Sequence, residues 1–180
     1  MEESVSGGID AFVPTTASPP DKVEALRRVH VFADLPDEQL QWFADNTEDK
    51  RFAAGDVLFR KGDKADRMVV YLEGEAHAYW DEADHDIVYI ARAGESSTEV
   101  TGMLPFSRMT EFTVTGYAVT DVRLLWFPVS LFPEMMQRMP VLVQRLVGIM
   151  SDRVRESTTL DQQQDKLWRS ANCQPDSLTS

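Results

Sequence analysis

Apolar residues recur at helical spacing at both ends of the chain and in short, closely spaced runs between them. Near the N-terminus, Val23, Leu26 and Val29 fall on one face, which predicts a helix over residues 21–30. A second helix is expected to begin at residues 35–37, and its apolar residues again share one side. Both helices are interpreted as packing elements.

The middle of the chain carries short apolar runs separated by turns rich in Gly and Asp, a pattern typical of β-strands. Two strands are expected within residues 52–63, and others at 68–72, 76–80, 87–91, 112–119 and 122–127. The strands at 76–80 and 87–91 should pair across the acidic turn at 81–86. About eight short strands at near-regular spacing predict a mainly β fold with flanking helices, a double-stranded β-helix or jelly roll.

A helical pattern returns after Pro128. A short helix is expected over residues 130–139, and a long one begins at Pro140, a position where proline is tolerated. Apolar residues recur every three or four positions along the long helix as far as Val154. This stripe can pack against the β region, against a partner helix, or against both.

The length of 180 residues, with 43% hydrophobic and 27% charged residues, suits one globular domain. We expect a disordered segment at residues 1–20 and a domain at 21–160. Within that domain the β-roll should occupy about 48–128 and the long helix about 140–160. Residues 161–180 are interpreted as a polar tail or linker.

Charge and cysteine content exclude several classes of protein. The net charge of −12 argues against a nucleic-acid partner, because phosphate backbones are bound by basic surfaces. The single cysteine, Cys173, excludes a disulfide framework and a four-cysteine metal site. No apolar run approaches the roughly 20 residues of a membrane span, and no signal peptide is recognisable. We therefore expect a soluble, cytoplasmic protein with no membrane partner.

The candidate chemistry lies in the segment from Glu99 to Arg108, which Gly102 and Pro105 punctuate. A helical turn that opens at Glu99 would leave free backbone N–H groups, which together with Arg108 form an anion site. A guanidinium binds two phosphate oxygens, and a carboxylate accepts from sugar hydroxyls. The pattern favours a ligand with a phosphate and a sugar, although both residues could also be ordinary surface charges.

A glycine-punctuated motif precedes this segment. Its residues are Phe52, Gly55, Asp56, Leu58, Phe59, Gly62, Asp63, Asp66 and Met68, followed by Gly74 and Gly94. Helices, this β-roll, a Glu and an Arg nine residues apart, and then a long helix together resemble the cyclic nucleotide-binding domain. The resemblance covers roughly residues 25–160 and extends to the input domains of some bacterial histidine kinases.

In that family the short segment is the phosphate-binding cassette. The resemblance implies that Glu99 accepts from the ribose 2′-hydroxyl and that Arg108 pairs with the cyclic phosphate. The cassette residues implied to bind ligand are Thr98, Glu99, Val100, Thr101, Gly102, Ser107, Arg108 and Met109. Met109 stands where guanine-preferring members tend to carry a hydroxyl, so cAMP is the first expected ligand and cGMP the second. Thr98 and Pro105 depart from the family pattern, which usually has Gly before the Glu and Pro next to the Arg.

The long helix carries a second resemblance. Residues 140–158 are similar to the dimerisation helix of bacterial catabolite activator proteins. This similarity implies a homodimer through residues 141–158 and ligand contacts from Arg153, Ser157 and Thr158. A solvated helix end is the alternative interpretation of Ser157 and Thr158.

Other functions are weighed against this one. A DNA-binding activator needs a further domain, and only about two dozen polar residues follow the long helix. The scattered histidines, among them His77, do not predict a metal site, and a haem ligand is less expected than a structural histidine. No nucleophile and base are recognisable, so we expect neither an enzyme nor a bound cofactor.

The sequence therefore predicts a regulatory domain that senses a cyclic nucleotide and relays binding through the C-terminal helix. Residues 161–167 resemble a linker to a histidine kinase, so a separate signalling protein such as a kinase is a candidate partner. The alternative is an interaction or dimerisation module with the same fold that has lost nucleotide binding.

Overall fold

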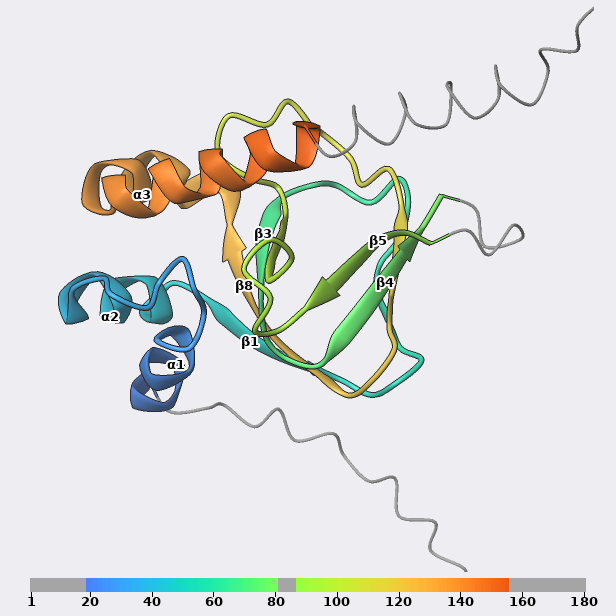
Figure 1. The fold of residues 1–180 in the computed structure, drawn as a ribbon, viewed down its shortest axis with the longest axis horizontal. Helices are drawn as coiled ribbons and strands as arrows, with labels where there is room; N and C mark the ends of the chain where they lie inside the picture. Colours follow the sequence, from blue (N-terminus) through green and yellow to red (C-terminus); the bar gives the residue numbers. More distant parts are fainter. Residues whose placement is uncertain (1–18, 81–86, 156–180) are drawn as a thin grey trace, which may run out of the picture.

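The computed structural model describes residues 19–80 and 87–155 (Figure 1). The helices before the β region are α1 (Pro19–Leu26) and α2 (Asp37–Asp45). The strands are β1 (Glu48–Phe52), β2 (Val57–Phe59), β3 (Arg67–Glu73), β4 (Glu75–Tyr79), β5 (Ile87–Arg92), β6 (Val100–Gly102), β7 (Thr115–Ala118) and β8 (Val122–Pro128). After them come the 3₁₀ turn η1 (Val129–Leu131), α3 (Phe132–Arg138) and a helix over residues 140–155.

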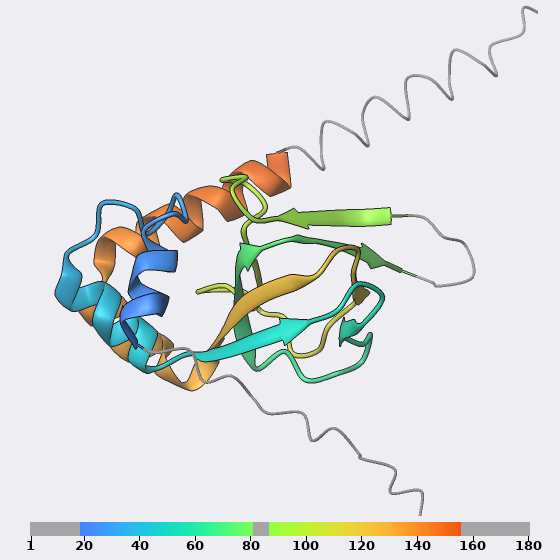
Figure 2. The ribbon, with the colours of Figure 1, turned by 90° about the horizontal axis from the view of Figure 1, so that it is seen from below.

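The strands form two four-stranded sheets with the orders β1-β8-β3-β6 and β2-β7-β4-β5. All pairings are antiparallel, and the helices gather at one side of the β-roll in both views (Figures 1 and 2). This arrangement confirms the predicted jelly roll with flanking helices. The predicted pairing of residues 76–80 with 87–91 is also present as β4 and β5, whereas the acidic turn at 81–86 lies outside the described residues.

The central strands β3 and β8 of the sheet β1-β8-β3-β6 are buried on both faces. Met68 and Val70 of β3 belong to the cluster under the helices, whereas Val69 and Tyr71 face the second sheet. This division follows from the alternation of side chains along a strand. Two covered faces explain why β3 reads in the sequence as an uninterrupted apolar run instead of an alternating one.

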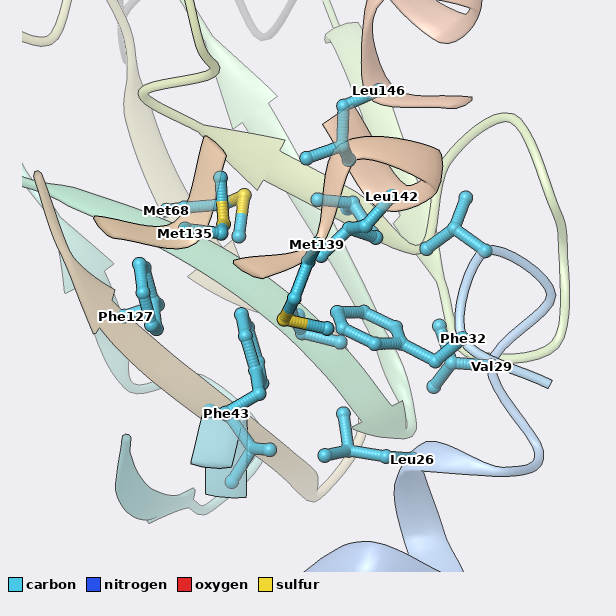
Figure 3. Close-up of a cluster of buried hydrophobic side chains, with 14 of the residues drawn as sticks. Leu26, Val29, Phe32, Phe43, Met68, Phe127, Met135, Met139, Leu142 and Leu146 are labelled. Atoms are coloured by element: carbon cyan, nitrogen blue, oxygen red, sulfur yellow. The ribbon is translucent and has the colours of Figure 1, made fainter. Parts of the chain in front are cut away.

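The helices share one apolar core with the outer face of this sheet (Figure 3). Phe43 of α2 stacks on Phe127 of β8 with ring centroids 4.5 Å apart, and Phe32 meets Phe43 at 4.7 Å. Leu142 and Leu146 of the C-terminal helix are fully buried in the same core. The C-terminal helix is therefore packed onto the domain through one stripe, as its periodicity predicted. Among the described residues, no helix is long and apolar enough to cross a membrane.

A buried ion pair joins the N-terminal helix to the β-roll. The Arg123 guanidinium, whose side chain is 5% exposed, contacts Asp49 of β1 and Asp21 of α1, each at 2.7 Å. The hydrogen bond to Asp49 is the main cause that raises the pKa of Arg123 above its usual value, and the guanidinium stays charged. The Asp49 side chain is 4% exposed, so Arg123 is the partner that compensates its buried carboxylate.

Substituting Arg123 by alanine should lower the free energy of unfolding by about 3–5 kcal/mol, because the buried Asp49 carboxylate would be left unpaired. Urea-induced unfolding measures this loss. The matched control is Glu134→Ala, which removes an exposed ion pair with Arg138 and should cost no more than about 0.5 kcal/mol. Equal losses in the two variants would contradict the prediction.

Candidate functional site

A cavity of about 210 Å³ lies inside the β-roll. Small residues on the inner face of the second sheet leave this space: Ala76 and Ala78 of β4, Ala91 of β5 and Gly116 of β7. A Cβ atom at Gly116 would lie 2.5 Å from the Phe59 ring, so the ring and a larger residue cannot occupy this place together. The hollow is thus a consequence of residue size on one face of one sheet.

Aromatic side chains form much of the cavity wall. Phe59 and Phe112 both line it, and their rings stack with centroids 4.6 Å apart. Tyr71 of β3 and Tyr89 of β5 add two further rings. Burial raises the pKa of the Tyr71 phenol, so Tyr71 is uncharged at neutral pH. The wall suits a ligand with a flat apolar face.

Arg153 brings the C-terminal helix to the edge of the cavity. Its guanidinium donates to the backbone oxygens of Ser97 at 2.8 Å and Val100 at 2.5 Å. It also lies over the ring of Tyr89, 5.0 Å from the centroid. One side chain therefore joins the helix, the segment before β6 and a cavity-lining ring.

The Glu99 side chain is fully buried and points to the N-terminal region instead of lining the cavity. The backbone N–H of His30 donates to Glu99 Oε1 at 2.6 Å, and His30 Nδ1 lies 3.2 Å from Glu99 Oε2. A buried carboxylate needs such partners, and here residues just beyond α1 supply them. In this conformation Glu99 fastens the N-terminal region to the β-roll.

The prediction of a helical turn that opens at Glu99 is wrong. Residues 100–102 form strand β6, which pairs with β3 through Val70↔Val100, Val69↔Thr101 and Met68↔Gly102. Antiparallel pairing with an apolar strand overrides the Gly/Pro signal, because β6 can bury Val100 against the helices by joining this sheet. Gly102 has a φ of +73°, and a Cβ there would lie 2.7 Å from the Arg67 backbone oxygen.

Arg108 is exposed, and no hydrogen bond or ion pair holds its side chain within the described ranges. It lies next to Met109, which lines the cavity and whose backbone N–H donates to Ser107 Oγ at 3.2 Å. The guanidinium is therefore exposed on the loop that follows β6, and its sequence neighbour Met109 lines the cavity.

The structure thus brings only part of the predicted site to the cavity. Of the residues implied to bind ligand, Thr101, Gly102, Met109 and Arg153 line the cavity, whereas Thr98, Glu99, Val100, Ser107 and Arg108 do not. Val100 packs in the helical core, and Thr98 Oγ1 accepts from the backbone N–H of Arg92 at 3.2 Å. Ser157 and Thr158 lie outside the described residues.

Sequence reasoning missed the walls of the cavity. Tyr71 and Tyr89 fall in the predicted strands at 68–72 and 87–91, and Phe59 in the glycine-punctuated motif, but the sequence does not predict that all three face inward. The alternation of Ala76 and Ala78 with larger residues along β4 was a usable signal, because two alanines on one face of a strand leave room.

His77 belongs to a polar chain on the other face of β4, as its alternation with Ala76 and Ala78 requires. Its Nε2 lies 2.6 Å from Glu75 Oε1, and Arg92 Nε donates to Glu75 Oε2 at 2.6 Å. The hydrogen bond from Arg92, followed by that from His77, lowers the pKa of Glu75. In the part of the chain that the structure describes, no cluster of side chains could hold a metal ion.

Substituting Glu99 by leucine should lower the free energy of unfolding by about 1–3 kcal/mol, because the His30 amide would lose its acceptor. Glutamine at this position keeps an oxygen that can accept from the His30 amide. The free energy of unfolding of Glu99→Gln should therefore remain closer to that of the original protein. Denaturant-induced unfolding of the three proteins tests this order. A leucine variant as stable as the original would show that the contact adds nothing.

Comparisons with known proteins match this architecture. Residues 49–139 match the model of the family described as the cyclic nucleotide-binding domain. A lysophospholipase of Aspergillus oryzae is 29% identical over 110 residues, which are 60% of this chain but 7% of that enzyme. The chain therefore corresponds to a small part of the curated relatives it matches.

Solved structures give the same result. A putative cyclic nucleotide-binding protein from Geobacter metallireducens is 27% identical, with a TM-score of 0.57 over 74% of this chain and 95% of that one. The catabolite activator protein of Thermus thermophilus is 19% identical and shares the fold, with a TM-score of 0.61 over 76% of this chain and 62% of that one. The matched family model and the shared jelly roll agree with the resemblance in the sequence, and the chain belongs to the cyclic nucleotide-binding domain family.

Proposed function

We propose that this chain is a regulatory domain that binds a cyclic nucleotide, cAMP first, in the cavity of the β-roll. The observation that carries the proposal is the hollow between the sheets, bordered by β6 and by the loop that presents Arg108. The apolar wall of the cavity suits the base of a nucleotide, and the guanidinium of Arg108 suits its phosphate. Family membership adds the ligand class.

Binding would require the site to open. The cavity of about 210 Å³ is smaller than the roughly 300–1,000 Å³ usual for ligands of drug size. The loop after β6, which carries Arg108, would move to admit the phosphate. Before Glu99 could accept a hydrogen bond from the ribose, its carboxylate would have to release His30. Both changes would alter how the β-roll holds its helices.

The relay would pass through Arg153. A ligand that reaches Tyr89 competes with the guanidinium over that ring, and displacing Arg153 frees the helix from the carbonyls of Ser97 and Val100. The helix over residues 140–155 would then shift relative to the β-roll, and a separate signalling protein such as a kinase would read the shift.

A second candidate is an interaction module with this fold that no longer binds a nucleotide. The burial of Glu99 against His30, together with the placement of Arg108 outside the cavity lining, favours this alternative. We do not propose the activity of the lysophospholipases for this chain, because the matched segment is only 7% of the Aspergillus oryzae enzyme.

Isothermal titration calorimetry with cAMP and cGMP tests the proposal. The protein should bind cAMP more tightly than cGMP, and Arg108→Ala should weaken cAMP binding by about 2–5 kcal/mol, the cost of losing a buried charge partner of the phosphate. Arg28→Ala removes another exposed arginine, away from the cavity, and should leave binding unchanged. Absence of heat with either nucleotide would reject the sensor and favour the interaction module.

We further propose that two copies pair through residues 141–158. On the C-terminal helix, Val147 and Val154 share one exposed face, Val154 at 67%, and Phe106 stands 70% exposed beside them, whereas the exposed Val141 lies about a third of a turn away. Exposed apolar side chains along one helix face, where the opposite stripe is already packed, suit a parallel partner helix.

Val154→Asp should convert the dimer to a monomer, because a charge would enter the apolar helix interface. Sedimentation equilibrium with and without cAMP measures the mass. Val119→Asp, at an exposed valine away from this helix, is the control and should remain dimeric. A monomeric mass for the original protein at high concentration would reject the pairing.

A further inference from the structure

The cavity in the β-roll offers a ligand no free charge. Its lining, in the part of the chain that the structure describes, contains two basic residues, Arg153 and His77, and no carboxylate. The Arg153 guanidinium already donates to the backbone oxygens of Ser97 and Val100. His77 Nε2 lies 2.6 Å from Glu75 Oε1, on the other face of β4. An ionised group would be buried here without a partner, at a large cost in free energy, so the cavity as it stands favours an uncharged ligand.

The volume of the cavity limits the size of such a ligand. An apolar cavity of about 150 Å³ holds benzene, a single ring. On this scale the cavity of about 210 Å³ has room for roughly eight non-hydrogen atoms, which matches a free nucleobase and is far less than a nucleotide. The rings of Phe59 and Tyr89 give the wall flat apolar surfaces against which a planar ring can pack.

Tyr71 adds a hydroxyl to this wall that packing does not require. The residue is 2% exposed, and its side chain lies in the apolar cluster between the sheets, where a phenylalanine would fill the same space. Burial raises the pKa of the Tyr71 phenol, and the nearby Thr101 hydroxyl offsets part of this rise. Thr101 Oγ1 is itself buried without a hydrogen-bond partner among the described residues. The wall therefore carries two neighbouring hydroxyls whose hydrogen-bonding capacity is not fully used.

Two hydroxyls in an apolar wall suit the edge of a neutral heterocycle. A hydroxyl can both donate and accept, and the edge of a nucleobase carries carbonyl or ring-nitrogen acceptors beside N–H donors. Such an edge satisfies both groups without bringing a charge into the cavity. It also needs neither of the changes that a cyclic nucleotide would require, because Glu99 can keep His30 and the loop that carries Arg108 can stay in place.

We infer that the cavity binds an uncharged, planar nitrogen heterocycle of nucleobase size, whose polar edge is bound by the hydroxyls of Tyr71 and Thr101. The ring occupies the space that the alanines of β4 and β5 leave, and it packs against Phe59 and Tyr89. This inference goes beyond the proposed function and is independent of it, because the ligand carries neither a phosphate nor a sugar.

Calorimetric titration of the full chain with uracil and with adenine tests this inference. At least one of the two bases should bind with a dissociation constant below about 1 mM. Tyr71→Phe keeps the ring and loses the hydroxyl, so it should bind that base about 3-fold to 10-fold more weakly. The matched control is Tyr79→Phe, which removes a hydroxyl from outside the cavity lining and should bind the base as the original protein does.

Nuclear Overhauser effects locate the bound base without any variant. Contacts between its ring protons and the methyl groups of Ala78 and Ala91 are expected, and binding without them would overturn the inference. Absence of binding by both bases, or equal affinity in Tyr71→Phe, would overturn it as well and leave the proposed function intact. A protein that binds a base in the cavity but neither cAMP nor cGMP would support the inference and reject the sensor.

Discussion

Burial of the central strands β3 and β8 on both faces of the sheet β1-β8-β3-β6 is the constraint on which the rest of the structure depends. One face needs helices to cover it, and α1, α2, α3 and the C-terminal helix supply a single core there. The other face needs the second sheet, where the alanines of β4 and β5 and Gly116 of β7 leave part of the space empty. The same strands therefore support the helices and border the hollow, so a change in the hollow can reach the helices through a rigid layer.

Two charged contacts tie distant parts of the chain to this layer, and they differ in kind. Arg123 is held by three carboxylates, and the one from Asp21 anchors α1 through side chains on both partners. Glu99 takes its hydrogen bonds from His30, partly from the backbone, directly beside β6. The first contact lies away from the cavity and suits stability. The second lies next to cavity-lining residues, so a change at the Glu99 carboxylate would affect both the stability of the fold and the access of a ligand.

The fold could be predicted from the sequence, but only part of the candidate site could. Apolar periodicity and Gly/Asp turns indicated the β-roll, and the Glu–Arg spacing indicated the rim segment that carries Arg108. The direction of the Glu99 side chain could not be read, because it depends on His30, which lies 69 residues earlier. The strand at Val100 was also missed, because pairing with β3 decides it, and local signals do not report long-range pairing.

The attachment of Arg153 has a consequence for variation in this chain. Its hydrogen bonds to Ser97 and Val100 end on main-chain oxygens, which every residue type possesses. Position 97 can thus change identity while Arg153 keeps its hydrogen bond there, provided that the backbone path is preserved, whereas Val100 is also fixed by its burial in the helical core. This hydrogen-bonded contact is asymmetric: it tolerates replacement of Ser97 and depends on the Arg153 side chain.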